Sequence, residues 1–431
     1  MVMWLNPIWL NSVNSSKIVT NGLAIPQYKT KNKIVMKQLK VLLIIIGFAL
    51  QSNGQPLLDI YKTGTLKLVQ EEEYAKGVIW NEVFSDYQEQ SLGKPVGLQR
   101  SIAVAPDGSV FVGSGSSYSI LKFDPNGKHV LTFGQKGSSN QDFKASPTLG
   151  GVVAGKYVFT YENNGHIKFF TLNGKYVKTI AVDYMPLKVI PLVNDIAVLG
   201  HVPLANRRVR DVVTIINPET ETMNIIRKYD DVWKSGALAL NKKNYIISYA
   251  PTFTSVNIQL RALPNGNLLV GITNSNQIEI YSPNGELKGS ISLNYEPLPY
   301  PEDMKKEFFK RIELMVEKGK HTKDEVASIY KEDFFPVNMP YYYNFLVDSE
   351  GNILVFRFTD EDVDHKFNVY TYDDSGKFIG EVVLETAGYN MAFQYRTDNV
   401  VYYKDMFIGV LNLQNDYSTP PKLLRFQLKV K

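Results

Sequence analysis

Short apolar runs separated by glycine-containing turns follow one another along most of this chain. The clearest set has four runs that the pattern predicts as strands, with turns at Pro106-Asp107-Gly108 and Asp124-Pro125-Asn126-Gly127: Ile102–Val104, Val110–Val112, Ile120–Phe123 and His129–Phe133. Tight turns between apolar runs are typical of antiparallel hairpins. The segment therefore predicts a four-stranded meander.

Weaker copies of this unit recur along the chain. They cover 152–180, 189–229, 260–293, 343–384 and 391–430. The turn residues repeat with a constant spacing: Gly108 and Gly155, in the first two units, are 47 residues apart, and so are Gly351 and Asp398, in the turns assigned to the last two units. A repeat of this period, with four strands in each copy, indicates a β-propeller. We predict an all-β, six-bladed β-propeller of four-stranded antiparallel blades. A β-sandwich is the alternative class, and seven blades stay open because 234–257 is surplus and contains the strand-like run Tyr245–Tyr249.

Two motifs resemble a known repeat family. The run Val112–Phe123 is similar to the strand-loop-strand core of NHL repeats, and Phe133-Gly134-Gln135-Lys136-Gly137, continuing to Pro147, is similar to their glycine-rich connector; Ser114 stands where those repeats usually have Asp. From about residue 60 to 430 the chain also resembles the exported six-bladed propellers of Bacteroidetes, which are NHL-like or TolB-like. This resemblance implies the fold and leaves the function open.

Two segments outside the repeats have a predicted structure. Thr65–Val69 alternates like a strand, and we expect it to join the last blade and close the ring. Between blades four and five, 301–335 predicts a helical hairpin, because Met304, Phe308, Ile312 and Met315 share one helix face and Gly319 ends the first helix. A capping box at Thr322–Glu325 opens the second helix. The hairpin would be either a lid near the channel or a packing element.

The composition narrows the class of protein. The chain has 431 residues and no cysteine, which excludes disulfides, thiolate catalysis, zinc-thiolate sites and a lipoprotein anchor. The formal net charge of +4 falls to −2 without residues 1–54, which hold six lysines and no acidic residue. A domain with a net charge this close to zero lacks the excess of positive charge that is typical of nucleic-acid binding.

The N-terminal region follows the order of a secretory signal peptide. Met36–Lys40 is basic, Val41–Leu50 is apolar, and Ser52 and Gly54 are small residues before a cleavage site at Gln55. We predict a signal peptide at 36–54, a non-native or disordered extension at 1–35, and a single propeller domain at 55–431 that is periplasmic or secreted. Ten apolar residues are too few to span a membrane, so we expect no transmembrane segment, and we expect a monomer.

Candidate binding residues gather on one face of the predicted propeller. The loops between second and third strands share that face with the connectors between blades, and loops on a rigid scaffold often bind ligands. The candidates on these loops are Tyr118, Tyr161, Glu162, Asn164, His201, Arg207, Arg208, Arg210, Asn274, Asn276, Asp360 and Asp362.

No pattern points to a reaction centre. The five histidines lie in different units without ligand spacing. Asp360–Asp364 would suit calcium, but it lacks the spacing and glycine of an EF-hand, so a solvated acidic loop is favoured and no cofactor is predicted. Arg207, Arg208 and Arg210 would suit a ligand carboxylate or sulfate, or form an ordinary charged loop. Tyr341–Tyr343 would either stack on a sugar or fill the seam between blades.

The sequence favours an exported binding protein or scaffold without catalytic residues. Its partner would be a small molecule, glycan, peptide or protein. The alternative is a metal-dependent hydrolase or lyase of the lactonase-like type, because six-bladed relatives include such enzymes, although Arg100–Ala103 lacks the acidic residue that a lactonase carries on this strand. Assembly with an outer-membrane complex is a third hypothesis.

Overall fold

The computed structural model describes the chain from residue 57 onward, with gaps. The described residues are 57–62, 64–84, 101–204, 209–230, 238–240, 246–248, 257–319, 337–358, 366–389, 391, 399–412 and 419–431. The predicted extension, the signal peptide and the second helix of the insertion lie outside them. The described part belongs to one compact unit, Pro56–Lys431.

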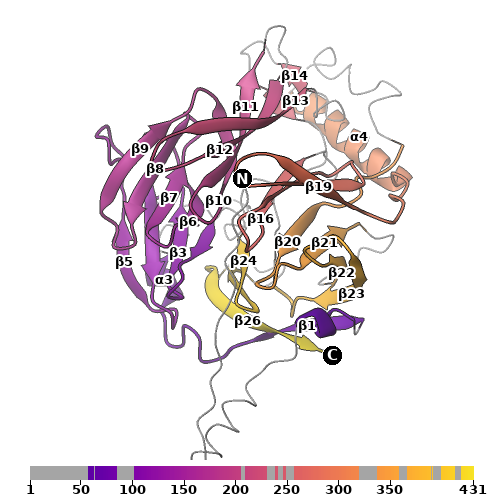
Figure 1. Ribbon diagram of the computed structural model, residues 1–431, viewed down its shortest axis with the longest axis horizontal. Coiled ribbons are helices and arrows are strands. Elements are labelled where there is room, and N and C mark those ends of the chain that lie inside the picture. Colours follow the sequence, from indigo (N-terminus) through magenta and orange to yellow (C-terminus); the bar gives the residue numbers. More distant parts are fainter. Residues whose placement is uncertain are drawn as a thin grey trace, which may run out of the picture. The chain divides into compact units, whose positions relative to one another are not determined.

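Four separate antiparallel sheets of four strands make up the first part of the domain (Figure 1). The first contains β2 (Ile102–Val104), β3 (Val110–Ser114), β4 (Ser119–Phe123) and β5 (His129–Phe133). The second contains β6 (Thr148–Val153), β7 (Tyr157–Tyr161), β8 (His166–Thr171) and β9 (Tyr176–Ala181). The third contains β10 (Met185–Pro191), β11 (Ile196–Pro203), β12 (Val209–Ile216) and β13 (Met223–Asp230). The fourth contains β16 (Ile258–Ala262), β17 (Leu268–Ile272), β18 (Gln277–Tyr281) and β19 (Leu287–Ser292).

The remaining strands form one eight-stranded sheet in the order β20-β21-β22-β23-β1-β26-β25-β24. Its members are β20 (Asn344–Val347), β21 (Ile353–Arg357), β22 (Lys366–Tyr372), β23 (Phe378–Glu385), β1 (Thr65–Gln70), β26 (Lys422–Val430), β25 (Met406–Leu411) and β24 (Val400–Tyr403). β1 pairs antiparallel with β26, which confirms the expected N-terminal strand, and it also pairs parallel with β23, which the sequence did not indicate.

The sheets follow one another so that their first strands meet. Each of these strands contacts the next one in the order β24, β2, β6, β10, β16 and β20. Neighbouring sheets bury apolar clusters between them, such as Val213, Leu260 and Val270 between the third and fourth sheets. This all-β arrangement of four-stranded sheets is consistent with a β-propeller.

The two ends of the strands carry different connections. The turn face holds the turns between first and second strands and between third and fourth strands. The loop face holds the loops between second and third strands and the connectors between sheets. At the turn face the predicted glycines adopt positive φ, for example Gly108 at 88° and Gly155 at 63°, a region in which other residues are strained.

Contacts between successive first turns form a closed circle on the turn face. Six contacts make this circle: Gly155 beside Pro106, Ala154 N to Val193 O, Gly266 beside Val193, Gly351 beside Pro264, Ser349 Oγ to Asp405 Oδ1, and Tyr403 Oη to Pro106 O. The last contact joins the C-terminal sheet to the first one. One sequence prediction is wrong here: the first turn of the last unit, which the repeat spacing assigned to Asp398, lies at Lys404-Asp405, where both residues have a positive φ.

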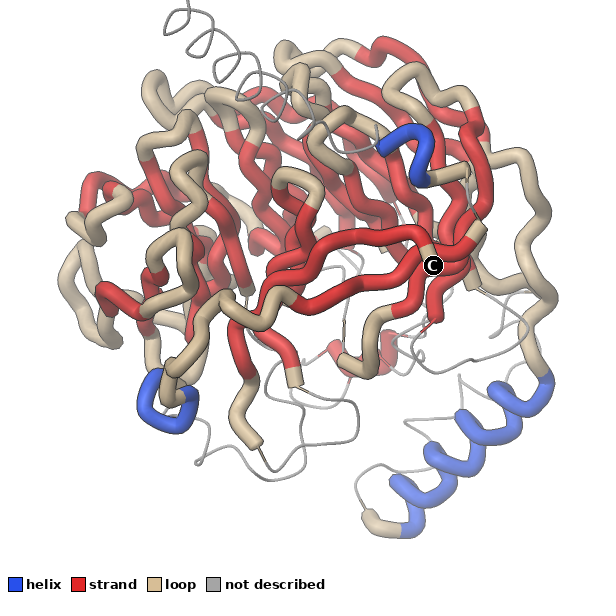
Figure 2. The backbone as a smooth tube through the Cα atoms, turned by 90° about the horizontal axis from the view of Figure 1, so that it is seen from below, coloured by secondary structure: helices blue, strands red, loops and turns tan. Residues whose placement is uncertain are grey.

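Two segments stand outside the four-stranded pattern. β14 (Leu238–Leu240) and β15 (Ile246–Ser248) pair as a separate hairpin within the surplus region. The helix α4 (Glu302–Glu317) confirms the first helix of the predicted insertion, and Gly319 follows it at a φ of 65°. In Figure 2, α4 stands clear of the strands. The described helices contain no segment that is long and apolar enough to cross a membrane.

Candidate functional site

The described candidates lie on the loop face, but they do not form a single cluster. Asn274 and Asn276 are exposed in the loop between β17 and β18, and Asn164 is exposed between β7 and β8. Arg210 binds Asp230 of the adjacent strand, with 2.6 Å between Nε and Oδ1. Arg207, Arg208, Asp360 and Asp362 lie outside the described residues.

Two of the candidate tyrosines are held by their own surroundings. Tyr161, at the end of β7, is 4% exposed and donates to the carbonyl of Leu187 at 3.1 Å, which ties the second sheet to the first strand of the third. Tyr118 adopts a φ of 53° in the loop between β3 and β4, and the Lys136 amine lies 5.1 Å from its ring centre. Of the two, only Tyr118 is partly exposed to solvent.

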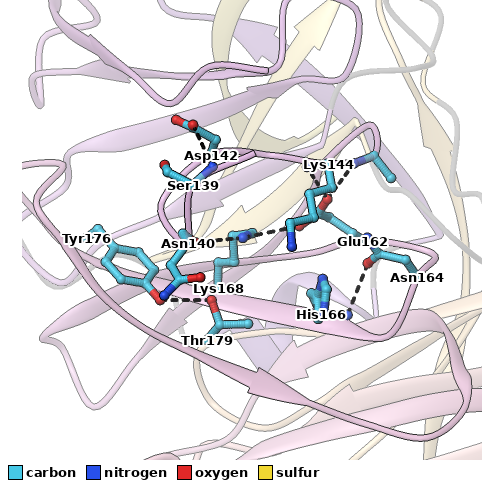
Figure 3. A network of polar contacts seen from close by, with 11 residues as sticks. Ser139, Asn140, Asp142, Lys144, Glu162, Asn164, His166, Lys168, Tyr176 and Thr179 are labelled. Atoms are coloured by element: carbon cyan, nitrogen blue, oxygen red, sulfur yellow. Dashed lines mark hydrogen bonds and ion pairs between the residues drawn. The ribbon is translucent and has the colours of Figure 1, made fainter. Parts of the chain in front are cut away.

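Glu162 lies beneath a connector and does not reach the surface. Its side chain is fully buried, and its Oε2 accepts the backbone N–H groups of Lys144 and Ala145 at 2.8 and 2.6 Å (Figure 3). Lys168 of β8 lies 3.7 Å from Glu162 Oε1 and donates to the carbonyl of Asn140 at 2.8 Å. The pair therefore fastens the connector 134–147 to the second sheet.

Burial and hydrogen bonding shift the pKa values of two groups in this network. Lys168 is 2% exposed, and desolvation lowers its pKa despite the opposing attraction of Glu162. Asp142 in the connector accepts Ser139 N at 3.1 Å and Gln135 Nε2 at 3.0 Å, and hydrogen bonding lowers the pKa of its carboxyl. A ligand would reach Glu162 only by displacing the connector.

His201 contacts a buried carboxylate. It stands opposite Asp211 in the register of β11 and β12, at the ends of these strands on the loop face, and its Nδ1 contacts Asp211 Oδ1. Among the described residues, no third histidine, cysteine or acidic residue joins them or any other pair to make a metal site. The contact fixes the orientation of the imidazole.

The tyrosine run Tyr341–Tyr343 enters the seams between sheets. Tyr342 is fully buried between the fourth and fifth units, and Tyr343 packs against Phe356 on the other side. Tyr341 accepts a hydrogen bond from Tyr295 at its carbonyl, 3.1 Å away. Of the two interpretations of this run, the seam-filling one is confirmed for Tyr342.

The polar residues of the first strands were missed by sequence reasoning. Gln259 and Asn344 are fully buried and Arg261 is 9% exposed, on the neighbouring strands β16 and β20. Arg261 donates to Asn344 Oδ1 at 2.9 Å, and Gln259 Nε2 lies 3.4 Å from the Tyr343 carbonyl. The only available signal was the polar-apolar alternation of Ile258–Ala262, which also fits a solvent-facing strand.

Comparisons place the chain beside other solved structures without assigning it to a family. No family model and no curated protein matches the sequence. A member of the DUF4221 family from Bacteroides vulgatus is 10% identical, with a TM-score of 0.47 over 86% of this chain and 99% of that one. A Bacteroides fragilis protein whose export is predicted is 11% identical, with a TM-score of 0.44 over 85% and 95%. Virginiamycin B lyase from Staphylococcus aureus is 10% identical, with a TM-score of 0.34 over 79% and 97%. Likenesses at this level transfer no function to the chain.

Proposed function

We propose that the chain is an exported, non-enzymatic binding propeller of six four-stranded blades, whose ligand site lies on the loop face near the central channel. The blade count is supported by the six first strands and by the six linked turns. The eight-stranded sheet divides at the parallel contact between β1 and β23 into two sets of four strands. On this division β1 is the outer strand of the sixth blade.

The observation that carries the binding function is the difference between the two faces. The turn face has short turns that contact one another around the ring, and their side chains bind their own backbone, as Asp124 and Asp373 do. The loop face carries the long connectors, including 134–147 and the described parts of the insertion, 293–319 with the helix α4 and 337–343. Long loops on a rigid scaffold are where binding residues concentrate, so the ligand is expected there.

Backbone hydrogen bonds at the base of the insertion also favour the loop face as the place of the ligand site. Tyr300 N donates to Val337 O at 3.0 Å and Met339 N donates to Leu298 O at 2.8 Å, so the two ends of the insertion form a short antiparallel stem. Tyr341 N then donates to Thr273 O at 2.8 Å, which fastens the stem to the loop between β17 and β18. The stem fixes where α4 leaves the body.

A thermal-shift screen followed by hydrogen exchange tests the proposal. The exported protein is screened against divalent metals, glycans and peptides, because a ligand that binds only the native state raises the melting temperature. We expect a glycan or peptide to raise it and to protect amides on the loop face. Protection confined to the turn face would contradict the proposed site. A rise with a divalent metal alone would favour the hydrolase or lyase instead.

Export is tested separately. N-terminal sequencing of the protein recovered outside the cytoplasm is expected to begin at Gln55, because the leader has the basic, apolar and small-residue order that signal peptidases require. Recovery of an intact Met1 from the cytoplasm would contradict export and would leave the binding proposal to its own test.

A further inference from the structure

Where the fourth and fifth units meet, several buried polar atoms have no hydrogen-bond partner among the described residues, and three of them come from β16 and from residues at or just before the start of β20. They are Gln259 Oε1, Tyr342 Oη and Asn344 Nδ2, and all three side chains are fully buried. A buried polar group without a partner costs about 1–3 kcal/mol, so such groups usually bind a water molecule or a ligand.

The three side chains belong to one place. Gln259 stands opposite Gly271 in the register of β16 and β17. A Cβ on Gly271 would lie 2.2 Å from Tyr342 Oη, so the absence of a side chain there makes room for the hydroxyl beside Gln259. Gln259 Nε2 in turn approaches the carbonyl of Tyr343, the residue that precedes Asn344.

Gln259 and Asn344 stand at the loop-face end of their strands. Asn344 is the first residue of β20 and Gln259 is the second residue of β16. Both strands begin at the loop face and belong to the set of first strands that meet one another. The cluster therefore lies at the end of the first strands where the proposed ligand site is.

The orientation of Asn344 is set by its other contacts. Its Oδ1 accepts Arg261 at 2.9 Å and the backbone N–H of Phe345 at 2.8 Å. These two donors assign the oxygen, so the amide nitrogen is the atom without a partner. Burial raises the pKa of Tyr342 well above its usual value, so its hydroxyl is neutral and can donate or accept.

The chemistry of the three atoms selects a class of ligand. Gln259 Oε1 only accepts, so its partner must donate, and Asn344 Nδ2 only donates, so its partner must accept. An ionised carboxylate cannot donate and would leave Gln259 Oε1 unsatisfied. A hydroxyl group does both at once, and a second hydroxyl on the next carbon would extend the same pattern.

We propose that Gln259, Tyr342 and Asn344 form a subsite for the hydroxyl groups of a small saccharide where the fourth and fifth units meet, at the loop-face end of their first strands. The inference rests on the proposed binding function and names the ligand class of that site. Arg261, which holds Asn344, is a positioning residue in this subsite.

Two variants and one control test the subsite. Gln259→Leu removes the acceptor at similar volume, and Asn344→Asp replaces the unpartnered N–H₂ by oxygen while keeping an acceptor for Arg261. Gln277→Leu is the matched control, because Gln277 is exposed on β18 of the same sheet. Without ligand, the melting temperature of Gln259→Leu is expected to stay close to that of the wild type, since the variant removes an unsatisfied buried acceptor together with the long 3.4 Å contact of Nε2 with the Tyr343 carbonyl.

The probes are D-glucose, D-galactose, D-mannose and D-xylose, with acetamide as the amide counterpart. We expect at least one sugar to raise the melting temperature of the wild type and of the control, and to bind each of the two variants about 10-fold more weakly or worse, as the loss of a buried hydrogen bond implies. No shift with any of the four sugars would overturn the proposal, as would a crystal structure with sugar present that shows only water on the three atoms. A shift with acetamide alone would also overturn it in favour of an amide ligand.

Failure of the subsite is distinguishable from failure of the binding function. A sugar that binds both variants as tightly as the wild type would remove the subsite and leave a binding protein. A peptide that protects the loop face, with no response to any sugar, would do the same. Only the absence of every ligand response would count against both.

Discussion

The N-terminal strand should contribute a large share of the domain's stability. In β1, Leu66 and Leu68 are 1% and 2% exposed and lie in one apolar cluster with Leu384 of β23 and Phe426 of β26. Replacing either leucine by alanine removes buried methyl groups and leaves a cavity, which typically costs about 2–5 kcal/mol. Because the two side chains share the cluster, the double variant should cost somewhat less than the sum of the single ones.

The assay is urea unfolding of the wild type, Leu66→Ala, Leu68→Ala and the control Lys67→Ala. Lys67 is exposed on the same strand, so its truncation should change the unfolding free energy by no more than about 0.5 kcal/mol. Since a domain of this kind has about 5–15 kcal/mol of stability in total, the double variant should lose a substantial part of it. If both leucine variants unfold like the control, β1 is a tail and the closure argument is wrong.

The remaining predictions concern the connector and the insertion. Glu162→Ala leaves Lys168 as an unpaired buried charge, so the variant should lose about 3–5 kcal/mol of unfolding free energy and the connector 134–147 should exchange its amides faster. The control Asn164→Ala changes an exposed side chain and should have neither effect. Equal stability of the two variants in urea would show that the Glu162–Lys168 pair does not fasten the connector. The lowered pKa of Lys168 means that the unfolded chain binds more protons above the folded pKa, so stability should rise with pH from there up to about 10.4, and Lys168→Met should remove that rise; an unchanged slope in urea titrations would disprove the assignment. The amides of α4 should exchange before those of β2 and β20, because the helix stands clear of the strands; equal protection would make α4 a packing element.

Most of the strands could be predicted because their turns are encoded locally. Glycine at positive φ, preceded by Asn or Asp, fixes a reversal wherever it occurs, as at Gly127 and Gly174. The last unit escaped this reasoning because Lys404 and Asp405 make its first turn without glycine. The parallel pairing of β1 with β23 also had no local signal, since it depends on where two distant segments meet.

For the candidate site, the sequence predicts which face of the domain carries it but not which residues form it. Glu162 follows a strand in a polar loop, and nothing local reveals that the connector 134–147 covers it. Gln259 and Arg261 alternate with apolar residues like a solvent-facing strand, yet a strand stacked between two sheets buries both of its faces. Residues of this kind are assigned by their long-range partners, which a single sequence does not contain.

The difference between local and long-range partners also explains why polar atoms without a partner occur at the loop-face end of the first strands β16 and β20. At the turn face, a short polar side chain binds the backbone two to four residues later, as Asp373 does with the N–H groups of Ser375 and Lys377. Such a group is satisfied by its own turn and needs no other unit. Asn344 and Gln259, at the start of their strands, have no turn to close, and their amides instead contact groups of the neighbouring unit, Arg261 and the Tyr343 carbonyl.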